Sequence, residues 1–104
     1  MRCNQCQPLP EEVARAADLL GRRWALAILW AAAETGAVRF NEFKRTLDGI
    51  PPRTLAARLT ELEEAGILER HVLDTRPPRA EYRLTEAGRR LRYVVEALNA
   101  YAAG

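Results

Sequence analysis

The sequence predicts an α+β fold that is mainly helical, and three observations support this class. Apolar residues recur at helical spacing through most of the 104-residue chain. Residues 67–84 instead alternate between apolar and polar residues, as a β-hairpin does. The triplet Pro-Pro-Arg occurs at 51–53 and again at 77–79. Because two consecutive prolines fit neither a helix interior nor a central strand, each triplet marks the edge of an element.

The first third of the chain predicts a polar arm and two helices. Residues 1–10 form the arm, and a single domain is expected over 11–104, a length that suits one small core. Pro10 and the two acidic residues after it favour a helix start, and Gly21 can end that helix. The segment "RRWALAILWAAAET" is apolar nearly all round, which predicts a buried central helix.

The middle of the chain predicts a short strand and two more helices. The segment "AVRF" is long enough only for a brief strand, and Asn41 is a suitable N-cap for a short third helix that Gly49 ends. A fourth helix is expected at about 52–65, with Leu55, Leu59 and Leu62 as its core stripe. A short helix, a tight turn and a second helix together make a helix-turn-helix.

The last third predicts a hairpin and a terminal helix. The hairpin spans about 67–84 with "TRPPR" at its tip, and a hairpin directly after a helix-turn-helix is a wing. Thr85 is expected to cap a single helix over about 85–103. The apolar face of this helix is wider than one small core can use, which favours burial against a second protomer.

The start of the fourth helix carries the residues expected to bind DNA. In a helix-turn-helix, the N-terminal residues of the second helix enter the major groove first. Away from the leucine stripe, this helix presents Arg53, Thr54, Ala57 and Arg58, and no acidic residue lies between 49 and 60. Arginine can bind guanine or phosphate, threonine a base or phosphate, and alanine a thymine methyl group. The alternative is an ordinary helix with solvated surface residues.

The expected tip of the wing carries the second group of candidate DNA-binding residues, Arg76 and Arg79. Prolines stiffen the tip, so less conformational entropy is lost when it docks, and arginine is attracted into narrow minor grooves. The alternative is a hairpin loop with ordinary charges. The net charge of +2 does not by itself indicate a nucleic-acid partner, although fifteen of the sixteen basic residues are arginine.

Three segments together resemble the HxlR-type winged helix-turn-helix transcriptional regulators of bacteria. They are "ADLLGRRWALAILW", "VRFNEFKRTLDGIPPRTLAARLTELEEAGILER" and "PPRAEYRLTEAGRRL", and the resemblance covers roughly residues 11–100. It implies a DNA-binding regulator that dimerises through its first and last helices on a pseudo-palindromic operator. It also implies that Trp24 is a core residue. The apolar residues expected at the dimer interface are Val13, Leu91, Val94, Val95, Leu98 and Tyr101.

Cys3 and Cys6 form a Cys-x-x-Cys motif in the N-terminal arm. Many members of the resembled family carry a cysteine at the start of the first helix, where this chain has Glu11, and some of those cysteines sense oxidants or electrophiles. Three readings of the pair stay open: a redox pair, half of a zinc site that a second chain would complete, or incidental thiols. A response to oxidants is therefore part of the expected function.

Other classes of function find little support in the sequence. No apolar run reaches the ~18 residues of a membrane span, and the N-terminus lacks a secretory signal, so a cytoplasmic protein is expected. No nucleophile–base pairing or phosphate-cradling glycine loop is visible, and neither an enzyme nor a cofactor is expected. Double-stranded DNA and a second copy of the chain are the expected partners. The alternative function is a protein–protein interaction module without specific DNA binding.

Overall fold

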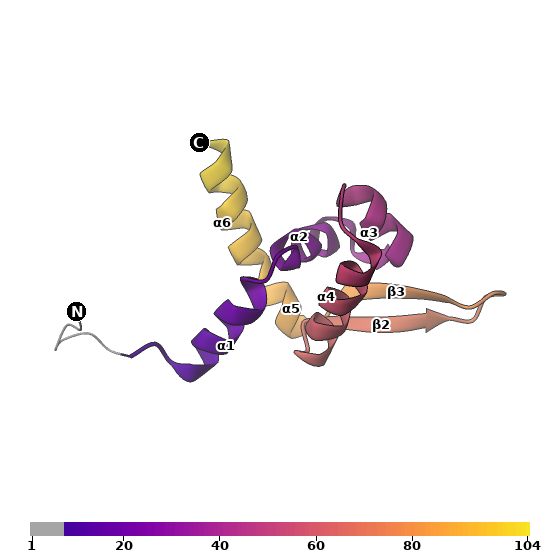
Figure 1. The fold of residues 1–104 in the computed structure, drawn as a ribbon, viewed down its shortest axis with the longest axis horizontal. Coiled ribbons are helices and arrows are strands. Elements are labelled where there is room, and N and C mark those ends of the chain that lie inside the picture. The colour runs from indigo at the N-terminus through magenta and orange to yellow at the C-terminus, as the bar shows by residue number, and fades with distance from the viewer. Residues whose placement is uncertain (1–7) are drawn as a thin grey trace.

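A computed structural model describes residues 8–104 as six helices and a three-stranded sheet (Figure 1). The elements follow in the order α1 (Glu11–Leu20), α2 (Ala25–Thr35), β1 (Ala37–Arg39), α3 (Phe40–Thr46), α4 (Pro52–Glu64), β2 (Leu68–Leu73), β3 (Arg79–Leu84), α5 (Glu86–Arg90) and α6 (Arg92–Ala103). The mainly helical α+β class is confirmed. In the part of the chain that is described, no helix is both long and apolar enough to cross a bilayer.

The sheet is antiparallel with the order β1-β3-β2, so β3 is the central strand. Tyr82 of β3 pairs with Val38 of β1 on one side and with Arg70 of β2 on the other. Beyond β1, the β2–β3 hairpin continues alone and projects from the body of the molecule (Figure 1). The predicted wing is therefore a long two-stranded arm whose root is held by the third strand.

The core lies where α2, α3 and α4 meet the root of this sheet. The leucine stripe predicted for α4 is buried, and so are Phe43 of α3 and Leu68 of β2. The ring of Phe43 meets the ring of Tyr82 edge to face, with centroids 6.3 Å apart. The core therefore fixes the helix-turn-helix against the base of the wing.

Two helices begin at residues other than those predicted. The helix α2 starts at Ala25, three residues after the predicted start, because Trp24 adopts a left-handed conformation with φ of 78°. Trp24 still packs against the core. The helix α3 starts at Phe40, so Arg39 and not Asn41 is its N-cap. The carboxylate of Glu42 reaches back to accept the Arg39 backbone N–H at 2.9 Å, which stabilises the earlier start.

The predicted terminal helix is divided at Leu91 into α5 and α6. Thr85 caps α5 as expected, since its hydroxyl accepts the Gly88 backbone N–H at 3.0 Å. Gly88 lies so close to the β2 entry that a Cβ atom there would be 2.1 Å from the backbone oxygen of Ile67. This contact requires glycine and holds α5 against the body. The change in direction at Leu91 then sends α6 away from it (Figure 1).

Candidate nucleic-acid interface

The head of α4 is built by a turn that contains a glycine and two prolines. Gly49 has φ of 87°, a conformation in which a side chain is strained, and Pro51 is extended as the N-cap residue. Pro52 occupies the first turn of α4, where its missing N–H removes no helical hydrogen bond. No acidic residue lies in this first turn, so the helix dipole adds to the positive charge of Arg53.

The buried leucines determine which residues α4 presents to solvent. Leu55 and Leu59 are 0% and 1% exposed, so the opposite face of the helix points outward. Arg53 and Ala57 are exposed, and Thr54 is half-buried beside the turn. Arg53, Thr54 and Ala57 therefore form one accessible surface at the head of the helix.

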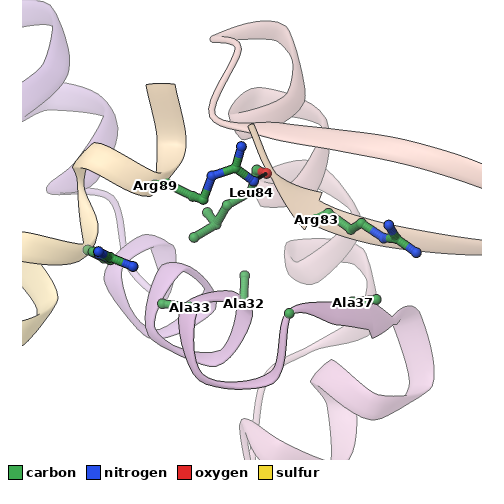
Figure 2. A pocket seen from close by; sticks show the side chains of 8 residues that line it. Ala32, Ala33, Ala37, Arg83, Leu84 and Arg89 are labelled. Atoms are coloured by element: carbon green, nitrogen blue, oxygen red, sulfur yellow. Dashed lines mark hydrogen bonds between the residues drawn. The ribbon is translucent and has the colours of Figure 1, made fainter. Parts of the chain in front are cut away.

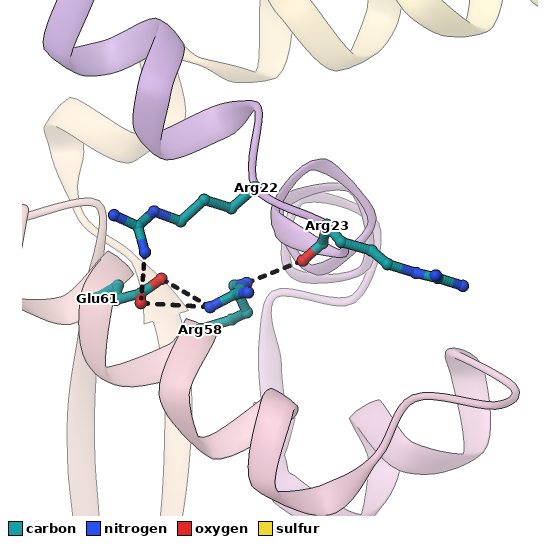
Figure 3. Close-up of polar contacts among 4 residues, drawn as sticks. All are labelled: Arg22, Arg23, Arg58 and Glu61. Carbon is teal, nitrogen blue, oxygen red and sulfur yellow. Dashed lines mark hydrogen bonds and ion pairs between the residues drawn. The ribbon is translucent and has the colours of Figure 1, made fainter.

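Arg58 does not point outward as predicted, which corrects its assignment to that surface (Figure 3). Its side chain is only 20% exposed. Its Nε atom donates to the backbone oxygen of Arg23 at 2.9 Å, and its Nη1 atom donates to both carboxylate oxygens of Glu61 at 3.1 and 3.2 Å. Glu61 also accepts a hydrogen bond from Arg22 at 3.1 Å. Glu61 at i+3 and the carbonyl group between α1 and α2 thus outcompete solvent for this guanidinium group.

This cluster of Arg22, Arg58, Glu61 and the Arg23 carbonyl group joins α4 to the segment that leads into α2 (Figure 3). Sequence reasoning missed Arg22 and Arg23, which lie more than thirty residues from their partners. The spacing of Glu61, three residues after Arg58, could have indicated the ion pair between these two residues of α4. No pattern indicated the Arg23 carbonyl group, because backbone acceptors leave no trace in a sequence.

The tip of the wing presents the second pair of predicted cations. Residues 74–78 connect β2 to β3, and the Thr75 hydroxyl donates to the backbone oxygen of Pro77 at 2.9 Å. Arg76 lies in this tip, and Arg79 is the first residue of β3, opposite Leu73. Both arginines are exposed, and neither forms an ion pair with any residue of the described range.

A further group of arginines lies beside the wing and was not predicted. Arg39 from β1, Arg45 from α3 and Arg79 from β3 line one hollow, together with Asn41 and Glu42. Glu42 is already engaged with the Arg39 backbone N–H group. Only the pairing of β1 with β3 brings these arginines together, so sequence spacing could not indicate them. Their charges extend the basic surface from the wing towards α3.

The residues predicted for a dimer interface lie on the helices that project from the body at the end opposite the wing (Figure 1). The helix α1 has no buried residue, and Val13 is 50% exposed. On α6, the side chains of Val94, Leu98 and Tyr101 are 39%, 45% and 87% exposed. These four residues are called the terminal apolar surface below.

Two of the residues predicted for the dimer interface contribute to the fold of one chain. Val95 is only 5% exposed and belongs to the core, which corrects its assignment to the interface. Leu91 is half-buried and packs against the same core. Both residues lie at the start of α6, where this helix still packs on α2 before it leaves the body.

Cys3 and Cys6 lie outside the described residues, so the structure does not test their pairing. Within residues 8–104, no three histidine, cysteine or acidic side chains are grouped as a metal site requires. Glu11 is exposed at the first turn of α1.

Comparison with known proteins identifies the family. The family model for the HxlR-like helix-turn-helix matches residues 19–104. An HTH-type transcriptional regulator of Mycobacterium tuberculosis is 49% identical over 81 residues, which are 78% of this chain and 50% of that protein. The regulator YvaP of Bacillus subtilis is 33% identical over 99 residues, which are 95% of this chain and 90% of YvaP. This chain thus spans half the length of the mycobacterial relative.

Solved structures show the same arrangement. The reduced form of the transcriptional regulator YodB from B. subtilis superposes with a TM-score of 0.77 at 36% identity, covering 91% of this chain and 92% of YodB. The redox regulator HypR in its oxidised form superposes with a TM-score of 0.82 at 36% identity, covering 88% and 94%. The fold, the sequence match and these neighbours agree. The chain belongs to the HxlR-like helix-turn-helix family.

Proposed function

We propose that this chain is a sequence-specific regulator of transcription that binds double-stranded DNA as a homodimer. The observation that carries the proposal is the exposed head of α4, which is free of acidic residues and lies beside a wing bearing Arg76 and Arg79. Both features are basic, project from the same body and suit a single duplex. Such a protein would act in the cytoplasm, where bacterial DNA lies.

In this proposal, the head of α4 reads bases and the wing contacts the backbone or the minor groove. Arg53 can bind the O6 and N7 atoms of guanine, and Ala57 can contact a thymine methyl group. Thr54 is half-buried, which suits a contact with phosphate beside the turn. Arg39 and Arg45 extend the phosphate-binding surface beside Arg79. Arg58 instead positions α4 through Glu61 and the Arg23 carbonyl group.

The terminal apolar surface supports the proposed dimer. Its residues on α6, Val94, Leu98 and Tyr101, recur at i, i+4 and i+7, so they lie along one face of the helix. Val13 is a further exposed apolar side chain, on α1. Burial against a second copy would remove these side chains from water. On an operator whose half-sites are one turn of DNA apart, the two α4 helices of such a dimer must lie about 34–36 Å apart.

The test is selection of bound sequences from random duplex DNA, followed by titration at several salt concentrations. Enrichment of an inverted repeat with half-sites one turn apart is the expected result. Affinity for that site should fall steeply with salt, since the arginines displace counterions from phosphate. If no sequence is enriched and the affinity for DNA does not depend on salt concentration, the proposal is overturned and a protein-interaction module is favoured.

A response to oxidants through Cys3 and Cys6 is a second proposed property. It is favoured by the Cys-x-x-Cys motif and by the likeness to YodB and HypR, whose structures include diamide-treated, quinone-bound and oxidised forms. Oxidation of this chain by diamide should weaken binding to the selected site. Cys3→Ser and Cys6→Ser should each abolish that response and leave binding by the reduced protein unchanged. A response that survives in both variants would exclude these thiols.

A further inference from the structure

A hollow at the junction of the body and α6 carries chemistry that DNA binding does not use (Figure 2). Its cavity volume is about 290 Å³. The last turn of α2, the start of β1, the end of β3 and the α5–α6 junction all contribute to its walls. Two stretches that are distant in the sequence, residues 32–37 and 83–92, thus build it.

The floor of the hollow is apolar and its rim is basic. Ala32, Ala33, Ala37 and Leu84 supply the apolar part, and small side chains on α2 and β1 leave the space open. Arg83, Arg89 and Arg92 are the charged residues that line it, and none of the lining residues is acidic. A surface of this composition suits a ligand with an apolar body and one anionic group.

Two of the three arginines have donors available for such an anion. Arg83 is paired with Glu81 at 3.4 Å. Within residues 8–104, Arg89 and Arg92 form no ion pair, and the guanidinium group of Arg92 lies over the ring of Tyr93, 5.7 Å from its centroid. That contact leaves the N–H donors of Arg92 unengaged. The Nη1 atom of Arg89 donates to the backbone oxygen of Leu84 at 3.3 Å, which holds its guanidinium group over the apolar floor (Figure 2). A guanidinium group has five N–H donors, so several are left for a ligand.

We propose that this hollow binds small carboxylates with an apolar body, with the carboxylate on Arg89 and Arg92 and the body on the alanine floor. Two unpaired cations at one apolar hollow repel each other and attract an anion, and the low-dielectric floor strengthens that attraction. A planar carboxylate matches the paired donors of a guanidinium group better than a spherical ion does. This site lies apart from the head of α4 and the tip of the wing.

The ligand-binding test uses calorimetric titration of the DNA-free protein with 3-phenylpropanoate. Saturable binding at one site per chain is expected, with a Kd in the millimolar range or tighter. The neutral 3-phenylpropanamide, acetate and inorganic phosphate should each bind about tenfold more weakly or worse, because each lacks the charge or the apolar body. No saturation by about 10 mM, or equal binding of the amide or of phosphate, would overturn the proposal.

Substitutions of the lining residues test whether the ligand binds in the hollow. Arg92→Gln and Arg89→Gln should each weaken binding about tenfold. Arg90→Gln is the matched control, because Arg90 lies between them in the sequence but does not line this hollow. Ala33→Leu should block the floor and abolish binding, with helical content by circular dichroism confirming that the variant folds. Equal losses in Arg90→Gln and Arg92→Gln would show a general charge effect and overturn the site.

A consequence for regulation rests on the proposed function and is measured separately. The hollow is lined by residues from the root of the wing and from α6. If the hollow and the DNA-binding surface share a conformational equilibrium, ligand binding in the hollow would change the affinity for DNA. The expected result is a change in affinity for the selected duplex when 3-phenylpropanoate is added, and no change in Ala33→Leu. If DNA is bound with unchanged affinity, the regulatory consequence is overturned. If no DNA is bound at all, the proposed function fails and the ligand titration still stands.

Discussion

The winged body and the terminal helices differ in how far their apolar side chains are buried. In the body, α2, α3, α4 and the sheet root bury a continuous core, and residues such as Phe43 and Leu59 are 0–1% exposed. In α1 no residue is buried, and in α6 only Val95 is. The helix α6 nevertheless carries large apolar side chains that face solvent, among them Leu98 and Tyr101.

This difference separates the apolar residues that form the core of one chain from those that stay exposed on it. A domain of this size has a large surface relative to its volume, so apolar residues beyond the first core must find a second surface. The core of the body is buried within one chain, whereas the apolar side chains of the terminal helices would be buried only in the proposed homodimer. The proposed dimer interface, on α1 and α6, thus lies at the end of the molecule opposite the wing (Figure 1).

The largest expected effect comes from the same substitution made in both regions. Leu59→Ala removes a fully packed side chain, so it should lower the free energy of unfolding by about 3 kcal/mol at every protein concentration. Leu98→Ala should lower apparent stability only at concentrations where the dimer forms. Urea unfolding at several protein concentrations measures both. A concentration-independent loss of similar size for Leu98→Ala would assign α6 to the fold of one chain.

A charge placed on α6 tests the dimer directly. Leu98→Glu should raise the dimer Kd by about 30-fold or more, since truncation or charging of a central interface residue costs about 2 kcal/mol or more. Asn99→Glu adds the same charge to the next residue of the helix and should change the Kd little. Sedimentation equilibrium measures the two constants. A dimer that tolerates Leu98→Glu would place the interface elsewhere.

Two arginines on α4 should separate DNA recognition from stability. Arg53→Ala should reduce affinity for the selected duplex by about 2 kcal/mol and relax the base preference at one position. Arg58→Ala should reduce the free energy of unfolding by about 1 kcal/mol, because Glu61 and the Arg23 carbonyl group lose their shared donor. Fluorescence anisotropy and urea unfolding of both variants provide the measurements. If Arg53→Ala alters only stability, the outward surface has been assigned wrongly.

The smallest expected effect concerns a single phosphate contact of the wing. Arg76→Ala should weaken binding to all sequences to a similar degree and reduce the slope of log K against log salt by about one unit. Arg70→Ala, on the exposed part of β2 away from the tip, serves as the comparison. Anisotropy titrations at four salt concentrations give the slopes. An unchanged slope for Arg76→Ala would remove the tip from the DNA contact.

The sequence by itself determined the order of the elements and the buried stripe of α4. Its helical and alternating periodicities, the two Pro-Pro-Arg triplets and Gly49 mark most boundaries, because these signals act through local backbone preferences. The exposed positions of Arg53 and Ala57 also followed, since Leu55 and Leu59 fix the rotation of the helix. Local rules failed at the starts of α2 and α3 and at Leu91, where contacts with other elements chose the boundary.

Only the tertiary structure decided which arginines are available and which apolar residues are covered. Arg58 was expected to face outward, but it lies three residues after Leu55 and four before Leu62, at the edge of the buried stripe. There a carbonyl group from the segment before α2 and the carboxylate of Glu61 hold it on the protein. Val95 has the spacing of an interface residue, yet it lies in the first turn of α6, where this helix packs on α2 and belongs to the core. Arg39, Arg45 and Arg79 become neighbours through the sheet. Contacts between distant segments depend on where the chain returns in space, and periodicity does not record that.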